Sequence, residues 1–265
     1  MSISSRKRLH LGLAAIMAAA LILPGCPKGP VTPVDLHGQD AEAALDGMRL
    51  RDKELDTLSV WGIVTFSGPQ GDGLANFVAH IDRQGFLRLE FVDPFFMPVM
   101  ILTLTNDSMQ ILDLRTGVMY ICAADAGSMQ RLTGIDLEPR LLFPALTGRL
   151  RFDDSAPEVR AAAGGKIIAA QGEMTCTLDP ELYLLTTLIS PMENSKSTEA
   201  RMSDIGLFRG VPLATKIACS NADTQDRQGV FNIDLTIEEV RINPKLNRDI
   251  FTLGVGEGIE IRDVQ

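Results

Sequence analysis

The feature that most constrains the fold is a run of six strand-like segments between residues 57 and 124, with no helical segment between them. Each segment is an alternating or short apolar run bounded by turn residues, as in β-strands. The six segments read LSVWGIVTF, LANFVAHID, FLRLEFVD, VMILTLT, MQILDLR and VMYICAA. Strands joined by turns this short must pair antiparallel, because a parallel connection needs a long crossover. The sequence therefore predicts an antiparallel meander.

A second series of strand-like segments follows residue 163. Its five segments read GKIIAAQGEMTCTLD, ELYLLTTLIS, EARMSDIGLF, PLATKIACS and GVFNIDLTIEEVRIN. In the last segment the apolar parity shifts after Ile237, which predicts a β-bulge at Glu238-Glu239 and a strongly bent sheet. We therefore expect a mainly β (α+β) fold, a curled antiparallel half-barrel of about ten to eleven strands with helices covering its concave face.

Two segments carry helical patterns. Residues 40–50 place apolar residues on one face, with Asp40 positioned to cap the helix start. Residues 136–146 form an insert between the two strand series, in which Leu141 and Leu142 share a face and Pro139 suits the first turn. We expect Pro144 to bend or split this helix.

The N-terminus is built like an export signal. A basic tip of three residues precedes an uncharged stretch that is too short to span a bilayer comfortably. The following Leu23-Pro24-Gly25-Cys26 resembles the lipobox of bacterial lipoproteins, which implies that Cys26 is lipidated. We expect a signal peptide at 1–25, the lipidated Cys26 with a flexible spacer at 26–37, and a single domain at 38–265. The alternative is an ordinary cleaved signal that happens to precede a cysteine.

Charge and composition exclude several functions. Residues 1–25 carry three basic and no acidic residues, so their removal takes the net charge from −9 to −12, which disfavours nucleic acid as a partner. Ligands for a metal are not clustered, and we expect no cofactor. His80 occupies a polar position of a strand, and no G-x-S-x-G motif accompanies it, so we expect no enzyme. The cysteines other than Cys26 could include one disulfide or could all be buried and free: Cys122, Cys176 and Cys219.

Methionine is unusually common in the predicted domain. Nine methionines follow residue 25, and their flexible side chains suit either core filling or an apolar cavity for acyl chains such as palmitate. Strand parity and helix face select the candidate cavity residues Phe77, Leu89, Leu102, Leu112, Leu141 and Leu142.

A proline-flanked apolar loop reads DPFFMP at residues 93–98. Prolines at both ends keep it out of the regular strand ladder. Phe95, Phe96 and Met97 either pack under the sheet edge or point outward and contact a membrane or an incoming acyl chain.

Taken together, these segments resemble the LolA/LolB superfamily of lipoprotein carriers and outer-membrane lipoprotein receptors. The similarity lies in LSVWGIVTF, FVDPFFMPV, LEPRLLFPALTGRL and INPKLNRDIFTLGVGEGIEI, the last of which is similar to a family ending with a Phe-led strand and a final hairpin. The resemblance implies an incomplete antiparallel barrel whose helices cover an apolar face that takes lipoprotein acyl chains. It also implies a lid arginine, for which Arg140, Arg149 and Arg151 are equal candidates.

The lipobox favours the membrane-anchored receptor type over the soluble carrier type. Pro27 stands where an aspartate would signal inner-membrane retention, which implies an outer-membrane lipoprotein whose domain faces the periplasm. We expect a monomer that binds an acyl chain or a lipoprotein, possibly received from a periplasmic carrier, in lipoprotein localisation. Two alternatives are an envelope scaffold or assembly factor without cargo and, more distantly, an esterase-like enzyme.

Overall fold

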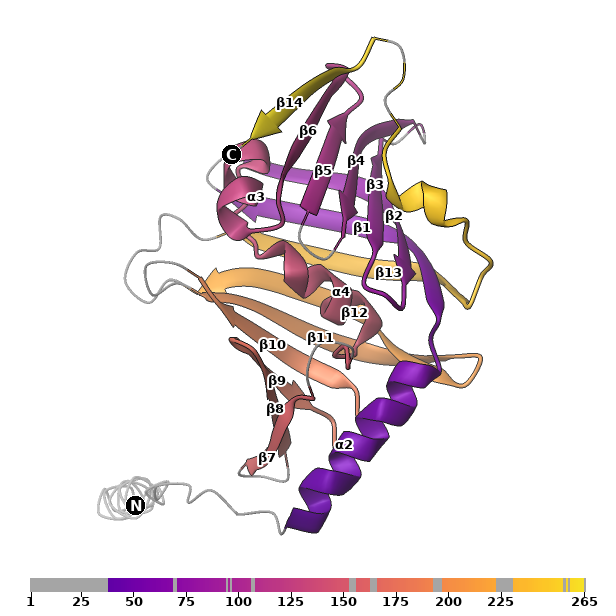
Figure 1. The fold of residues 1–265 in the computed structure, drawn as a ribbon, viewed down its shortest axis with the longest axis vertical. Coiled ribbons are helices and arrows are strands. Elements are labelled where there is room, and N and C mark those ends of the chain that lie inside the picture. Colours follow the sequence, from indigo (N-terminus) through magenta and orange to yellow (C-terminus); the bar gives the residue numbers. More distant parts are fainter. Residues whose placement is uncertain are drawn as a thin grey trace, which may run out of the picture. The chain divides into compact units, whose positions relative to one another are not determined.

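The described residues form one large open sheet, seen in Figure 1. In this computed structural model they are residues 38–68, 71–93, 95, 97–105, 108–152, 156–162, 166–192, 197–222, 231–254, 256 and 258–264. They contain fourteen strands, in the sheet order β14-β6-β5-β4-β3-β2-β1-β13-β12-β11-β10-β9-β8-β7. The predicted signal peptide, Cys26 and the predicted spacer lie outside the described residues.

The strands fall into the two predicted series, followed by a last strand at the C-terminus. The first series comprises β1 (Thr57–Gly68), β2 (Gly71–Asp82), β3 (Leu87–Val92), β4 (Pro98–Leu104), β5 (Ser108–Asp113) and β6 (Val118–Ala123). The second comprises β7 (Glu158–Ala162), β8 (Lys166–Gln171), β9 (Met174–Leu178), β10 (Leu185–Pro191), β11 (Ser197–Phe208), β12 (Val211–Ala222) and β13 (Asn232–Ile242), and β14 (Glu260–Val264) follows. The fold is mainly β and the sheet is curled and open, which confirms the predicted class.

The strand count exceeds the predicted ten to eleven for three local reasons. The segment 166–178 is two strands, because Gly172 turns the chain between β8 and β9 with a positive φ of 59°. β7 pairs with β8 as an additional edge strand. β14 pairs parallel with β6, where we expected a final hairpin.

The predicted bulge in β13 is confirmed. Trp61 of β1 pairs with Glu239 and Gly62 pairs with Ile237, so Glu238 has no partner in the β1 register. Gly62 permits the close approach of β1 to β13 at the bulge, since a Cβ atom built on it would lie 2.1 Å from the carbonyl oxygen of Thr236. The extra residue bends the sheet where the two series of strands meet.

The helices differ in detail from the prediction. Helix α2 (Gly38–Lys53) begins two residues before Asp40, so Asp40 does not hold the N-cap position. Helix α3 (Ala126–Thr133) was not predicted, although Asp125 caps its start and Gly134 ends it in the left-handed conformation. None of the described helices is long and apolar enough to cross a membrane.

The insert is shorter than 136–146 and is split. It consists of a 3-10 helix, η1 (Pro139–Leu141), followed by α4 (Leu142–Thr147). Pro144 lies in the first turn of α4. The N–H groups of a first turn have no intrahelical acceptor, so the missing N–H of Pro144 costs the helix no hydrogen bond.

The C-terminal segment is a further correction. The residues around Phe251 form a 3-10 helix, η4 (Arg248–Phe251), in place of a Phe-led strand. The Phe251 ring packs against the Phe86 ring with centroids 6.0 Å apart, which holds this segment beside the start of β3.

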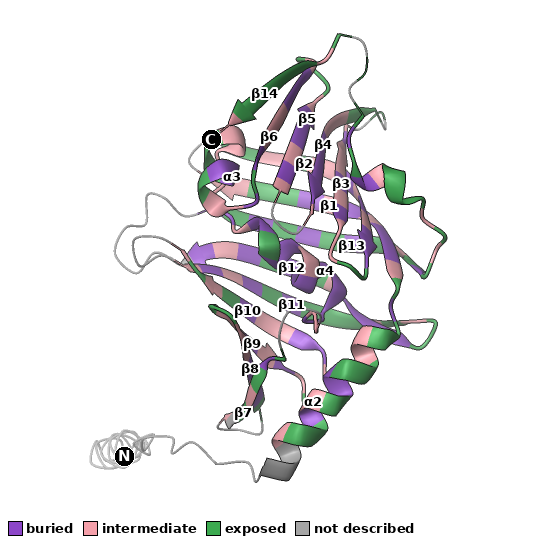
Figure 2. Cartoon of the chain, viewed as in Figure 1, coloured by how far each residue is buried: buried purple, intermediate pink, exposed green. Residues whose placement is uncertain are grey.

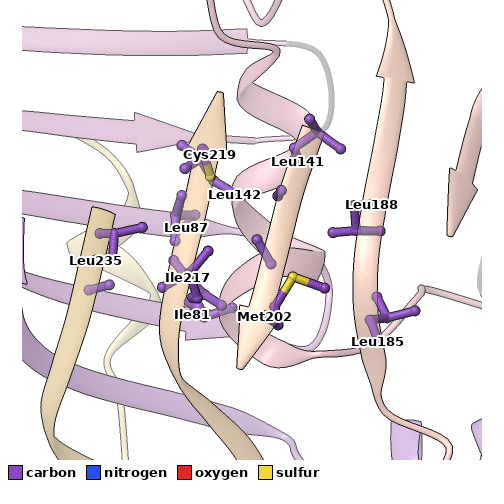
Figure 3. Packing of buried hydrophobic residues seen from close by; sticks show 14 of the residues in the cluster. Ile81, Leu87, Leu141, Leu142, Leu185, Leu188, Met202, Ile217, Cys219 and Leu235 are labelled. Carbon is purple, nitrogen blue, oxygen red and sulfur yellow. The ribbon is translucent and has the colours of Figure 1, made fainter. Parts of the chain in front are cut away.

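The core lies between the concave face of the sheet and the helices. Buried and exposed residues alternate along β13 and along the first half of β11, as a sheet with one covered face requires (Figure 2). Helix α4 packs against β10, β11 and β12. Figure 3 shows Leu141 and Leu142 of the insert among buried side chains of these strands, including Leu188, Met202 and Cys219.

Candidate functional site

An apolar pocket of about 520 Å³ lies between the concave face of the sheet and the helical segment from α3 to α4. Strands β1 to β6, β12 and β13 form its floor and walls, and α3, residues 134–137 and Leu142 of α4 cover it. This volume falls within the usual range for small-molecule sites. Apolar side chains make up most of its lining, among them Leu89, Phe91, Met100, Ile111, Leu132 and Ile135.

The cover of the pocket is placed by its helix ends. The Oδ1 atom of Asp125 accepts a hydrogen bond of 2.7 Å from the backbone N–H of Ser128, which fixes the start of α3. Gly134, with a φ of 74°, ends the helix and turns the chain toward Leu137 and η1. These two caps direct Met129 and Leu132 into the pocket.

Charged residues reach the pocket at the turn between β5 and β6. Asp113 and Arg115 both line it, and they are the charged residues among its described lining. The Oδ1 atom of Asp113 accepts a hydrogen bond of 2.9 Å from the backbone N–H of Arg115. The pocket thus joins an apolar interior to a charged rim.

Exposed apolar side chains surround this rim. Phe66 lines the pocket itself, and Leu114 lies in the turn between the lining residues Asp113 and Arg115. Phe95 is 83% exposed, and Met97 is also exposed, in the loop between the lining residues Phe91 and Val99. The structure therefore places Phe95 and Met97 outward, and not under the sheet edge. Phe96 lies outside the described residues.

The predicted cavity residues do not all line the pocket. Leu89 and Leu142 line the pocket. Phe77, Leu102 and Leu141 are buried in the main core but do not line the pocket. Whether any of them contacts a lipid remains a prediction.

Leu112 is a correction, because it points to the opposite face of the sheet. It packs there with Ile101, Met119 and Leu253, while its neighbour Ile111 lines the pocket. Strand β5 is apolar on both faces, since the C-terminal segment covers its outer side, so parity alone could not choose between Ile111 and Leu112.

Sequence reasoning also missed Phe91, Tyr120 and the α3 residues that line the pocket. For Phe91, the signal was present, since it continues the parity of Leu87 and Leu89 in β3. The methionines have both of the predicted roles. Met100 and Met129 line the pocket, and most of the others pack in the core.

The three described cysteines are free and buried, which answers the question of a disulfide for these residues. Burial raises the pKa of both Cys176 and Cys219 to about 12. Cys219 lines the pocket and Cys122 contacts the carbonyl oxygen of Met109 at 3.7 Å. These thiols stay protonated at neutral pH and act as small apolar groups.

The three candidate lid arginines differ in their surroundings. Arg140 is exposed, and Arg151 lies over the Phe143 ring at 6.0 Å from its centroid. Arg149 is only 6% exposed, and its guanidinium donates to the carbonyl oxygen of Arg51 in the last turn of α2. Burial lowers the pKa of Arg149 to about 10, so it remains charged at neutral pH.

His80 is the histidine among the described residues that could take part in catalysis or metal binding. His80 is half-buried in β2, and its Nδ1 atom lies 2.8 Å from the Oγ atom of Ser59. Within the described ranges, no three His, Cys, Asp or Glu residues are grouped as metal ligands.

Comparisons with known proteins define the fold. No family model matches the sequence, and no curated protein matches it. A LolA superfamily protein from Nitrosomonas europaea matches with a TM-score of 0.56 and 11% identity, and a DUF1329 family protein from Desulfovibrio piger with 0.56 and 9%. A domain described as an outer membrane lipoprotein-sorting protein, from Vibrio parahaemolyticus, matches with 0.53 and 10%. Each match covers 80% of this chain and 97% of the other. The chain therefore has a LolA/LolB-like fold.

Proposed function

We propose that this protein, a chain with the LolA/LolB-like fold, is a lipid-anchored envelope lipoprotein that binds an acyl chain or a lipoprotein in the pocket beneath α3 and α4. The observation that carries the proposal is the pocket itself, an apolar volume of about 520 Å³ between a curled sheet and a helical cover. Acyl chains bind in such a space because each methylene removed from water contributes about 0.8 kcal/mol.

The cellular role follows from the anchor and the fold. We propose that lipid on Cys26 holds the protein in the outer membrane with its domain facing the periplasm, and that it takes part in lipoprotein localisation. A periplasmic carrier would deliver the cargo to a monomeric receptor. The protein acts by binding and release, without chemistry and without a cofactor.

A cavity-filling variant tests the binding proposal. Ala75 lines the pocket, so Ala75→Phe places a ring in the space that the ligand needs. Ala43 is exposed on α2, so Ala43→Phe adds the same ring away from the pocket and serves as the matched control. Native mass spectrometry of protein purified without detergent should show a bound lipid in the wild type and in Ala43→Phe, and not in Ala75→Phe.

Displacement of a fluorescent fatty acid by a lipopeptide provides the second measurement. We expect the lipopeptide to compete with the dye in the wild type and the Ala75→Phe protein to bind neither. A wild type that binds no apolar ligand by either measurement would refute the binding proposal. The exposed apolar residues around the pocket would then favour an envelope scaffold.

The anchor has its own test. Cys26→Ser removes the thiol that would carry the lipid, so we expect the protein to move from the membrane fraction to the soluble fraction. The domain should keep its unfolding transition, because eleven residues, 27–37, which we expect to be a spacer, separate Cys26 from the first described residue. Recovery of the variant in carbonate-washed membranes would contradict the anchor.

A further inference from the structure

Arg115 stands at the rim of the pocket, and its guanidinium has no ion-pair partner among the described residues. It is the basic residue among the described lining of the pocket, and its side chain is exposed. Its backbone N–H donates to Asp113, but no described residue forms an ion pair or a hydrogen bond with its guanidinium. Arg262, on the neighbouring β14, differs in this respect because it binds Glu260 through two hydrogen bonds of 2.8 and 3.2 Å.

The turn that carries Arg115 is tightly fixed. The N–H of Gly117 donates to the carbonyl oxygen of Asp113, and Gly117 adopts a φ of 68°. The N–H of Leu114 donates to the carbonyl oxygen of Val99, which ties the turn to β4. The backbone of Arg115 is therefore held at the pocket rim, and Arg115 lines the pocket without a rearrangement of the turn.

Asp113 determines how deep an anion can go. Its carboxylate lines the pocket, where it repels an anionic group from the interior. One of its oxygens is already occupied by the N–H of Arg115, so it also shapes the turn. An anionic group is thus disfavoured inside the pocket and favoured at the outer side of the turn, beside the guanidinium.

We infer that Arg115 binds the anionic headgroup, a carboxylate or a phosphate, of the amphiphile whose chain occupies the pocket. The inference rests on the proposed function. A guanidinium presents paired N–H donors that match both headgroups, and such charge-assisted hydrogen bonds are among the stronger ones in proteins. Because the whole chain has a net charge of −9, attraction for an anion must come from a local group such as this one.

The experiment compares ligands with one chain length and different headgroups. A neutral dye, N-phenyl-1-naphthylamine, reports pocket occupancy, and it is displaced by dodecanoate, dodecyl phosphate, dodecanol or dodecyltrimethylammonium. In Arg115→Gln we expect a three- to tenfold loss of affinity for the two anions, as for a partly exposed charged pair, and less than a twofold change for dodecanol and the dye. Arg115→Glu should shift the preference toward the cationic ligand. Arg201→Gln, at an exposed arginine that binds Glu199 and is not among the described lining of the pocket, is the control and should change each affinity less than twofold.

The outcomes separate the inference from the proposed function. If the wild type binds neither the dye nor dodecanol, the proposed function fails and the inference fails with it. If all ligands bind and Arg115→Gln leaves the ratio of dodecanoate to dodecanol affinity unchanged, only the inference is overturned. A loss confined to dodecyl phosphate assigns Arg115 to phosphate headgroups, and a loss confined to dodecanoate assigns it to fatty acids. A variant that loses only binding to anionic phospholipid vesicles would overturn the inference in favour of a bilayer contact.

Discussion

At the scale of single residues, Arg149 is a buried cation whose hydrogen bonding within the described residues is incomplete. It is buried, and two of its nitrogens, Nε and one terminal nitrogen, have no hydrogen-bond partner there. Its ion pair with Glu54 is long, at 3.9 Å, while its other terminal nitrogen binds the carbonyl oxygen of Arg51. Its hydrogen bonding is incomplete, so the free-energy cost of removing this charge from water offsets much of its attraction for Glu54 and for the Arg51 carbonyl. Arg149 therefore helps to fix the position of α2 more than it stabilises the fold.

Two substitutions separate the charge of Arg149 from its bulk. Arg149→Met keeps most of the volume and removes the desolvated charge, so we expect a free energy of unfolding within about 1 kcal/mol of the wild type. Arg149→Ala also leaves a void, and we expect a loss of about 2 to 4 kcal/mol. Urea denaturation measures both, with the exposed Arg140→Met as control. If Met costs as much as Ala, the bond to Arg51 stabilises the fold and our interpretation is wrong.

His80 gives the stability a pH dependence. Burial lowers the pKa of His80, Glu90 raises it, and Arg88 and Arg241 lower it further. The folded state thus favours the neutral ring, so the unfolded state binds the proton more readily as the pH falls through about 6.5. Stability from this group is present at neutral pH and is lost on acidification. His80→Gln, which does not titrate, should lose less stability than the wild type between pH 7.5 and 5.0 in urea titrations. If the wild type and His80→Gln lose the same stability over this pH range, groups other than His80 cause the pH dependence.

At the scale of elements, α2 is held by a loop distant in sequence. Arg51 donates from Nε to the carbonyl oxygen of Leu182 at 3.0 Å, and Ala44 and Met48 bury the apolar face of the helix. The Tyr183 ring lies against Gly47, so that a Cβ atom on Gly47 would be 2.4 Å from the ring. The helix and the loop from Asp179 to Leu184 therefore fit only because residue 47 has no side chain.

This fit predicts that Gly47→Ala destabilises the protein despite the higher helix propensity of alanine. Overpacking costs about 1 to 3 kcal/mol and the higher helix propensity of alanine contributes about 1 kcal/mol of stability, so we expect a net loss of up to about 2 kcal/mol. Gly254→Ala is the control, because nothing lies within 4 Å of a Cβ atom there. Amide hydrogen exchange should show faster exchange in α2 of Gly47→Ala alone. An unchanged α2 would mean that Tyr183 moves aside freely.

The elements also show what the sequence could and could not predict. The bulge at Glu238 was predictable because β13 has one covered face, so a slip in register changes the apolar parity visibly. Leu112 was assigned to the wrong face because a segment from the far end of the chain covers the outer side of β5. The local sequence pattern contains no information about that contact. Helix α3 was missed because eight residues are too few for a clear period, although Asp125 and Gly134 are typical caps.

At the scale of the whole described domain, several exposed apolar side chains lie near the mouth of the pocket. Among the described residues ten large apolar side chains are exposed, and four of them line the pocket or lie in its rim segments: Phe66, Phe95, Met97 and Leu114. Hydrogen bonding keeps the loop of Phe95 and Met97 in place, since Asp93 accepts the backbone N–H groups of both residues. An acidic protein gains little from charge at an anionic bilayer, so apolar contact must supply its affinity for the surface.

We therefore predict that Phe95 and Met97 bring the pocket mouth to a membrane. In a Cys26→Ser background, which removes the proposed anchor, Phe95→Glu with Met97→Glu should lower binding to neutral phospholipid vesicles at least about fivefold, because the apolar area that enters the interface is lost. Both side chains are exposed, so the free energy of unfolding should change by less than about 1 kcal/mol. Leu207→Glu is the matched control, since Leu207 is 73% exposed at the end of β11, a strand that contributes no residue to the described lining of the pocket. An equal loss in Leu207→Glu would indicate a general effect of added charge, and unchanged vesicle binding in the double variant would show that this rim does not meet the bilayer.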